Sequence, residues 1–237
     1  MPRLSVGQEE SWLALLELSR RIPNGWCVVG GQMVHMHCQE RGVTPSRPTD
    51  DGDAMLDLRT EPQMLYRFTE VLYDLAFRPD GETDRGHQHR WTRGEAKVDV
   101  LIPDHMGERT ETRKGYLGGT TIAAPGARSA LDRAEQVHVT VAGTTGLVWR
   151  PRLAGAIAAK AAALSIVIDP KWKRHLTDIA VLSTLIRRGD LPRGEFSKTE
   201  LSRINNALGR IVQNPDVIVT VEGAANGLER LRLSISS

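Results

Sequence analysis

Apolar and polar positions repeat with two different periods along the first 150 residues, and this pattern predicts helices mixed with strands. Apolar residues at helical spacing predict helices over residues 8–21, 32–41 and 62–75. Short apolar or alternating runs predict strands at residues 26–29, 52–58, 87–92, 96–102, 137–141 and 147–149, with one more near Phe77. Residues 104–135 have no clear period, and we expect irregular structure there, with a strand near 116–122 and a short helix after Pro125.

From Pro151 onward the pattern becomes mainly helical. Alanine-rich and amphipathic segments predict helices over 151–167 and 171–188. A third helix is expected after Ser197-Lys198-Thr199-Glu200, which matches a capping box. Two apolar runs near the C-terminus, 217–221 and 231–235, are interpreted as short strands.

The predicted strand 52–58 has one acidic face. Successive side chains of a strand point to opposite faces, so Ala54 and Leu56 face one way while Asp51 and Asp53 face the other. These two carboxylates should lie roughly 7 Å apart along the strand. Asp57 continues the acidic face, and we interpret it as a structural charge.

A third carboxylate, Asp99, lies inside the apolar strand 96–102 and can join Asp51 and Asp53 from a neighbouring strand. Like charges held together cost free energy. A hard divalent cation such as Mg²⁺ removes that cost, because its preferred ligands are oxygens. Gly30 and Gly31 end a strand and precede a helix, so their backbone N–H groups are open to phosphate. The combination predicts phosphoryl or nucleotidyl transfer.

Composition limits the class of protein but does not identify its binding partner. The formal net charge is +2, from 31 basic and 29 acidic side chains, which neither demands a nucleic acid nor excludes a local basic groove. The two cysteines, Cys27 and Cys38, lie in core-like segments and are expected to be reduced thiols. No apolar run reaches the roughly 18 residues of a membrane helix, and no signal peptide is recognised. The expected location is therefore the cytoplasm.

Gly30-Gly31, then Arg47-x-Thr49-x-Asp51-x-Asp53, then Asp99 in a later strand together resemble the nucleotidyltransferase superfamily with the polymerase-beta-like core. The closest resemblance is to its AbiEii-type branch, which includes toxins of toxin–antitoxin pairs. It covers residues 26–102 well and about 150–182 more loosely. Gly52 departs from the pattern, because the family usually has an apolar residue there.

The resemblance implies an α+β fold, with a nucleotidyltransferase core of a mixed sheet flanked by helices over residues 1–150. A mainly helical C-terminal region over 151–237 would complete the nucleotide cleft. It implies that the three aspartates bind two Mg²⁺ ions, with Mn²⁺ as the alternative, and that these three and Lys160 are catalytic. The nucleotide-binding residues that it implies are Gly30, Gly31, Arg47, Thr49, Lys160 and Asp178.

Lys160 also stands out without the family comparison. It falls on the apolar stripe of the predicted helix 151–167, where its ammonium group needs a partner or reaches solvent. The family carries an Arg or Lys and then an Asp on the next helix, matched here by Lys173 or Arg174 and by Asp178. A further Asp is usual where this sequence has Val181, so the match is partial.

The implied activity is transfer of a nucleoside monophosphate from an NTP to RNA, with a tRNA 3′ end as the expected acceptor and a cognate antitoxin as the expected partner. One alternative is a small acceptor such as an aminoglycoside. Another is a degenerate, non-catalytic module that senses nucleotide or binds protein. A basic run with Trp91 among it provides a candidate RNA groove beside the acids, unless it is a solvated strand face. The run consists of Arg85, His87, His89, Arg90, Arg93 and Lys97.

Overall fold

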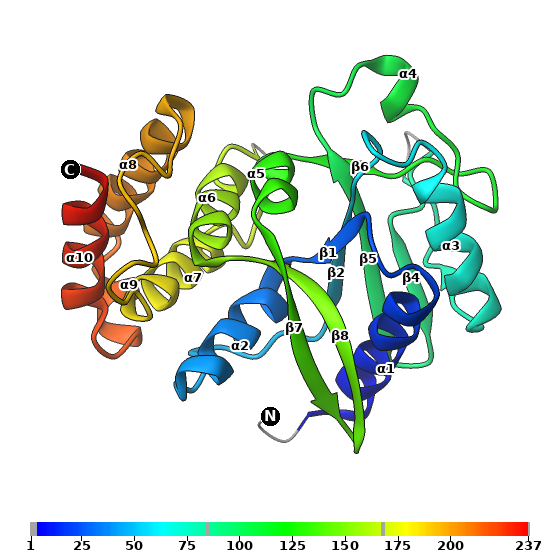
Figure 1. Ribbon diagram of the computed structural model, residues 1–237, viewed down its shortest axis with the longest axis horizontal. Helices are drawn as coiled ribbons and strands as arrows, with labels where there is room; N and C mark the ends of the chain where they lie inside the picture. The colour runs from blue at the N-terminus through cyan, green and yellow to red at the C-terminus, as the bar shows by residue number, and fades with distance from the viewer. Residues whose placement is uncertain (1–3, 84–85, 167–168, 237) are drawn as a thin grey trace.

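The computed structural model describes residues 4–83, 86–166 and 169–236. Its centre is a six-stranded mixed sheet in the order β1-β2-β5-β4-β3, with β6 paired to β5 (Figure 1). The strands are β1 Trp26–Val28, β2 Gly52–Leu56, β3 Arg78–Pro79, β4 Arg90–Arg93, β5 Ala96–Pro103 and β6 Ile122–Ala124. Strands β2 and β5 are parallel neighbours, whereas β1–β2 and β4–β5 are antiparallel. The α+β class with a mixed sheet flanked by helices is confirmed.

The two faces of the sheet differ as the alternation predicts. Ala54 and Leu56 of β2 are fully buried in the main core, into which the helices α1 Val6–Arg21 and α3 Met64–Asp74 also pack. Met55 lies on the opposite face, in a smaller apolar cluster with Cys27 and Val29. Asp53 and Asp99 therefore lie on the face of this smaller cluster. The departure at Gly52 has a packing explanation, because an added Cβ would lie 3.1 Å from Cδ1 of Leu15 in α1.

The helix α2, Gly30–Arg41, begins at the two glycines rather than after them. It ends at Gly42, whose φ of 71° places it in the left-handed region that favours glycine at a helix end. Cys27 and Cys38 are buried and free, as expected.

A hairpin of β7 Ala134–Val141 and β8 Thr144–Pro151 packs against α1 and β1. The prediction of two strands here is confirmed, although both are longer than expected. Ala142 and Gly143 form the turn with φ of 49° and 78°, the left-handed conformation of both central residues that suits a two-residue hairpin loop.

The stretch 104–135, which the sequence left irregular, contains α4 Glu108–Glu111, β6 and α5 Ala127–Asp132. The strand expected near 116–122 was placed too early, since β6 begins only at Ile122. None of the helices in the described ranges has the length and apolar character that crossing a bilayer requires.

All secondary-structure elements in the described residues after β8 are helices, joined by turns and loops. Helices α6 and α7 lie between the sheet and the outer helices α8, α9 and α10 (Figure 1). These helices are α6 Leu153–Ala163, α7 Lys173–Thr184, α8 Lys198–Val212, α9 Pro215–Thr220 and α10 Ala224–Ser236. The capping box of α8 is formed as predicted, with Ser197 and Glu200 exchanging hydrogen bonds.

The two strands predicted near the C-terminus are wrong. Residues 217–221 lie mostly in α9, and 231–235 lie in α10. The residues buried here are Val217, Val221, Ala224, Leu228 and Leu231, which recur every three or four positions. That spacing is helical, and it extends across both short runs that we interpreted separately as strands.

Candidate active site

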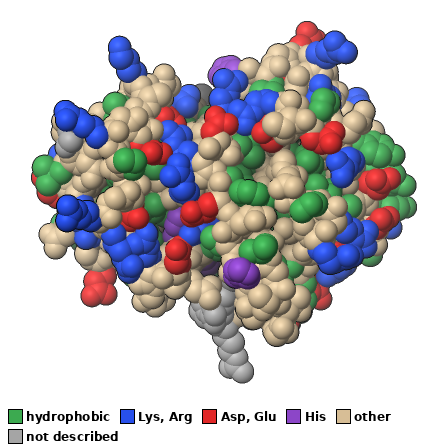
Figure 2. Space-filling model, in the orientation of Figure 1, with side chains coloured by type: hydrophobic (Ala, Val, Ile, Leu, Met, Phe, Trp, Pro, Cys, Tyr) green, Lys and Arg blue, Asp and Glu red, His purple; other side chains and the backbone are tan. Residues whose placement is uncertain are grey.

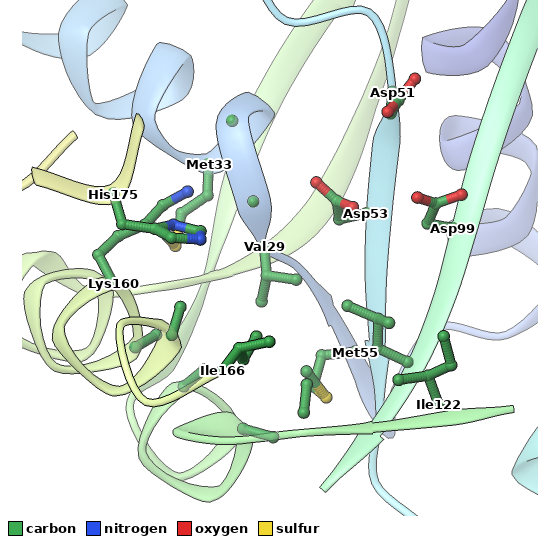
Figure 3. A pocket seen from close by; sticks show the side chains of 18 of the residues that line it. Val29, Met33, Asp51, Asp53, Met55, Asp99, Ile122, Lys160, Ile166 and His175 are labelled. Carbon is green, nitrogen blue, oxygen red and sulfur yellow. The ribbon is translucent and has the colours of Figure 1, made fainter. Parts of the chain in front are cut away.

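Asp53 and Asp99 face each other across neighbouring strands. They are register partners in the parallel pairing of β2 with β5, and Asp51 comes directly before β2 (Figure 3). All three line one pocket of about 480 Å³, which lies between the sheet and the α6–α7 region. The structure therefore brings together the three carboxylates that the sequence singled out, although their role stays a prediction.

The surroundings of Asp53 disfavour the charged form of its carboxylate. Burial and the nearby charge of Asp99 raise its pKa to about 7, and Asp51 adds to the effect. Lys160 and Arg174 act in the opposite direction. The side chain is half-buried, and the described part of the chain donates no hydrogen bond to its carboxylate. A cation beside Asp53 would restore the charged form.

Sequence reasoning placed Arg90 in the basic run of the candidate RNA groove but did not predict its contacts with the acids. Arg90 donates hydrogen bonds to Asp99 through Nε at 2.8 Å and Nη2 at 2.7 Å, and a third through Nη2 to Asp51 at 3.0 Å. No group of three His, Cys, Asp or Glu side chains in the described ranges is arranged to hold a metal ion as it stands. Arg90 lies between two of the candidate ligands and supplies the positive charge that they require.

The two glycines are required by close approaches to the predicted site. An added Cβ on Gly30 would overlap the carboxylate of Asp53, and one on Gly31 would overlap the side chain of Thr49. Gly30 also has a φ of 63°. The N-terminus of α2 thus lies directly against β2, where its free backbone N–H groups meet the pocket.

The opposite side of the pocket is cationic, and a buried carboxylate organises it. Asp178 of α7 is 1% exposed and accepts a hydrogen bond from Lys160 Nζ of α6 at 2.7 Å. It also accepts from Nε and Nη2 of Arg47 at 2.9 and 2.8 Å. Although burial disfavours its charge, Lys160 and Arg47 hold the pKa of Asp178 below its usual value. Lys160 and Arg47 line the pocket, and Asp178 positions both.

Arg174 also lines the pocket, so it occupies the position that the sequence left open between Lys173 and Arg174. Lys173 instead contacts the exposed Asp216 at 3.3 Å. Beside Arg174, His175 lines the same wall and contacts Asp169. We name Arg47, Lys160, Arg174 and His175 the cationic wall. Sequence reasoning missed His175, whose only signal was its place next to the basic residues at the start of α7.

The floor of the pocket is apolar. Below the acids along β2 and β5 it is formed by side chains of the sheet and by one residue that follows α6, and several of them are labelled in Figure 3. The main contributors are Val29, Met55, Leu101, Ile122 and Ile166. The pocket thus combines an acidic wall, a cationic wall and an apolar floor.

Other sequence candidates lie outside this arrangement. Asp57 pairs with Arg59 at 2.8 Å, in keeping with the structural charge that we expected. Trp91 is 1% exposed, so its ring is not open to stacking with a base. Arg93 donates to the carbonyl of Leu75 and does not line the pocket. Arg85 lies outside the described residues.

Among solved structures, the chain is similar to an antigenic nucleotidyltransferase-like protein from Paracoccidioides brasiliensis. The TM-score is 0.54 at 15% identity, over 96% of this chain and 94% of that chain. It also aligns with the antibiotic-resistance factor ANT(2'')-Ia, with a TM-score of 0.48 at 13% identity, over 90% of this chain and 97% of that chain. No family model matches the sequence, and a search of curated proteins found no match. The first likeness shows that the fold is nucleotidyltransferase-like.

Proposed function

We propose that this protein is a metal-dependent nucleotidyltransferase that moves a nucleoside monophosphate from an NTP to a hydroxyl group of an acceptor. One observation carries the proposal: a single pocket has carboxylates of β2 and β5 on one side and Lys160, Arg47 and Arg174 on the other. A triphosphate with its cation is complementary to such a divided pocket, because its metal-bound end and its free oxygens require opposite charges.

The three carboxylates suit a hard cation. Asp51, Asp53 and Asp99 offer oxygen atoms only, and burial together with the charge of Asp99 raises the pKa of Asp53, which a bound cation would lower again. These residues would hold Mg²⁺ or Mn²⁺, two ions by analogy with the resembled family, once Arg90 yields its contacts. The bound metal supplies Lewis acidity, which lowers the pKa of the acceptor hydroxyl and neutralises charge on the triphosphate.

The remaining residues bind and orient the nucleotide. In this proposal the first N–H groups of α2, at Gly30 and Gly31, bind phosphate oxygens, and Thr49 packs against Gly31 at that turn. Lys160 and Arg174 bind the phosphates that leave as pyrophosphate and stabilise the charge that grows on them in an in-line displacement. Asp178 acts through Lys160 and Arg47 as a positioning residue.

Two classes of acceptor are candidates, RNA and small molecules, and different observations favour each. The resemblance to AbiEii-type proteins favours RNA, with a tRNA 3′ end as the acceptor and a toxin role opposed by an antitoxin. The argument for an RNA groove along the basic run of β4 is weaker than the sequence suggested, because Trp91 is buried and Arg90 is hydrogen-bonded to carboxylates. On the face drawn in Figure 2, basic and acidic side chains are interspersed. These observations favour a small acceptor, such as an aminoglycoside, as the second candidate.

One assay tests the proposal and separates the acceptors. The protein is incubated with Mg²⁺ and each α-labelled NTP, together with either total cellular RNA or a panel of aminoglycosides, and transfer of label is measured. We expect label on one acceptor class with wild type, none with Asp51→Asn or Asp99→Asn, and full transfer with the exposed control Asp80→Asn. Absence of transfer to either class, despite nucleotide binding, would favour the non-catalytic module.

A further inference from the structure

The imidazole ring of His175 contacts the carboxylate of Asp169. Its Nε2 atom lies 3.0 Å from Oδ2 of Asp169, and the side chain is 7% exposed. Burial disfavours the charge of Asp169, but the hydrogen bond from the backbone of Lys171 and the charge of Arg174 keep its pKa below the usual value. An ionised carboxylate can only accept, so Nε2 carries the hydrogen and Nδ1 has a lone pair.

That lone pair has no donor within residues 4–83, 86–166 and 169–236. Nδ1 of His175 is buried and has no hydrogen-bond partner among the described residues. Burial, together with the charges of Lys160 and Arg174, lowers the pKa of His175 to about 4, whereas Asp178 and Asp169 act in the opposite direction. The imidazole is therefore neutral at pH 7 in the free protein. A buried acceptor without a donor costs free energy, which indicates that a group is missing beside it.

The cationic wall is also short of charge for its proposed ligand. Arg47 and Lys160 share the carboxylate of Asp178, and Arg174 lies 3.4 Å from that of Asp169. These five groups together leave one net positive charge. A triphosphate carries several negative charges at neutral pH and donates no hydrogen bond when fully ionised. Beside a phosphate oxygen, the lone pair of a neutral Nδ1 would repel, whereas a protonated Nδ1 would donate a hydrogen bond.

We propose that a bound triphosphate draws one proton onto Nδ1 of His175, so that the side chain becomes an additional cation of the wall and donates a hydrogen bond to a phosphate oxygen. The inference rests on the proposed function, because it takes the triphosphate as the ligand. Asp169 fixes the tautomer and stabilises the imidazolium that forms. His175 is thereby a phosphate-binding residue whose charge depends on occupancy of the pocket. Figure 3 shows His175 beside Lys160, across the pocket from the three aspartates.

Calorimetry measures the proton directly. Wild type is titrated at neutral pH with Mg²⁺ and α,β-methylene-ATP, and separately with Mg²⁺ and tripolyphosphate, in buffers of low and high ionisation enthalpy. The dependence of the binding enthalpy on buffer gives the protons taken up. We expect wild type to take up about one proton more per ligand than His175→Gln, whose amide can still donate to Asp169 but cannot titrate.

Three comparisons sharpen the result. His175→Asn, with an amide near the position of Nδ1, should also lose the uptake, and Asp169→Asn should reduce it. The exposed control His138→Gln should behave as wild type. Equal proton uptake by wild type and His175→Gln would overturn the inference while leaving the proposed function intact. Failure of wild type to bind either ligand would overturn both.

Discussion

Arg90 lies directly opposite Asp99 in the antiparallel pairing of β4 with β5, and its guanidinium grips that carboxylate with two hydrogen bonds while a third reaches Asp51. A guanidinium and a divalent cation cannot both take these oxygens. A metal ion bound as proposed would therefore compete with one of the protein's own side chains.

Replacing Arg90 with Gln should tighten metal binding in the absence of nucleotide. Removing the guanidinium leaves the three carboxylates without a counter-charge, and we expect roughly tenfold higher Mn²⁺ affinity, the size of one charge-assisted hydrogen bond. Electron paramagnetic resonance of free Mn²⁺ measures it. The control is Arg93→Gln on the same strand, which should leave affinity unchanged. Weaker binding by Arg90→Gln would mean that Arg90 aligns the ligands rather than competing with the ion.

Asp178→Asn should destabilise the protein strongly. The substitution leaves Lys160, which is 5% exposed, and the half-buried Arg47 without their shared counter-charge. Breaking a buried ion pair in this way costs about 3 kcal/mol or more in the free energy of unfolding. Urea denaturation followed by circular dichroism gives the value.

The matched control for Asp178 is Asp216→Asn. Asp216, in α9, contacts Lys173 at the start of α7, the helix that also carries Asp178. Both side chains of this pair are more than half exposed. An exposed pair contributes under about 1 kcal/mol, so stability should change little. Comparable losses in the two variants would contradict the view that Asp178 organises the cationic wall.

Gly30→Ala should abolish nucleotide transfer because the added Cβ overlaps Asp53. The variant Gly42→Ala separates this overlap from the effect of backbone strain. Gly30 and Gly42 have similar φ values, 63° and 71°, but only at Gly30 would a Cβ meet another side chain, the carboxylate of Asp53. Both alanine variants pay about 1–2 kcal/mol for the left-handed backbone. We expect Gly42→Ala to retain activity at a temperature where both are folded. Equal activities would mean that the overlap with Asp53 is relieved without harm.

Acid should destabilise the protein through two buried histidines. Burial and Arg150 lower the pKa of His37 to about 3, and that of His175 is lowered to about 4. The unfolded chain binds these protons near pH 6.5, while the folded chain does not, so stability falls as pH falls below about 6.5. Each histidine contributes a slope of up to about 1.4 kcal/mol per pH unit.

His37→Gln tests the pH dependence. Denaturation curves between pH 7 and pH 4.5 should show a shallower loss of stability in this variant than in wild type. His37 donates from Nε2 to the carbonyl of Pro151, 3.0 Å away, and the glutamine amide can also donate there. An unchanged slope would mean that other groups control the acid response.

Local patterns in the sequence predicted the parts of the site that depend on one strand or one turn. The alternation in β2 separated Asp53 from Ala54 and Leu56, and the glycines marked the start of α2. The order of Lys160 and Asp178 on successive helices was also readable. Their contact with Arg47 was not, because it joins residues 131 positions apart in the chain.

The contact of Arg90 with Asp99 could have been predicted from the register of the β4–β5 hairpin. The tight turn after Arg93 sets the register of β4 against β5, in which Arg93 faces Ala96 and Arg90 faces Asp99. The missed helices α9 and α10 have a different cause. Each apolar run was judged alone, and the helical recurrence from Val217 to Leu231 becomes visible only across the glycine-containing turn between them.

The shared carboxylate of Asp178 limits how this chain can be recombined. It lies in the C-terminal half, yet one of its two cations, Arg47, comes from the loop that leads into β2. In a chimera that takes one of these parts from a distant relative, either Asp178 or Arg47 would be left at the junction without its partner. Grafting either part of the chain therefore requires that both Asp178 and Arg47 be carried across together.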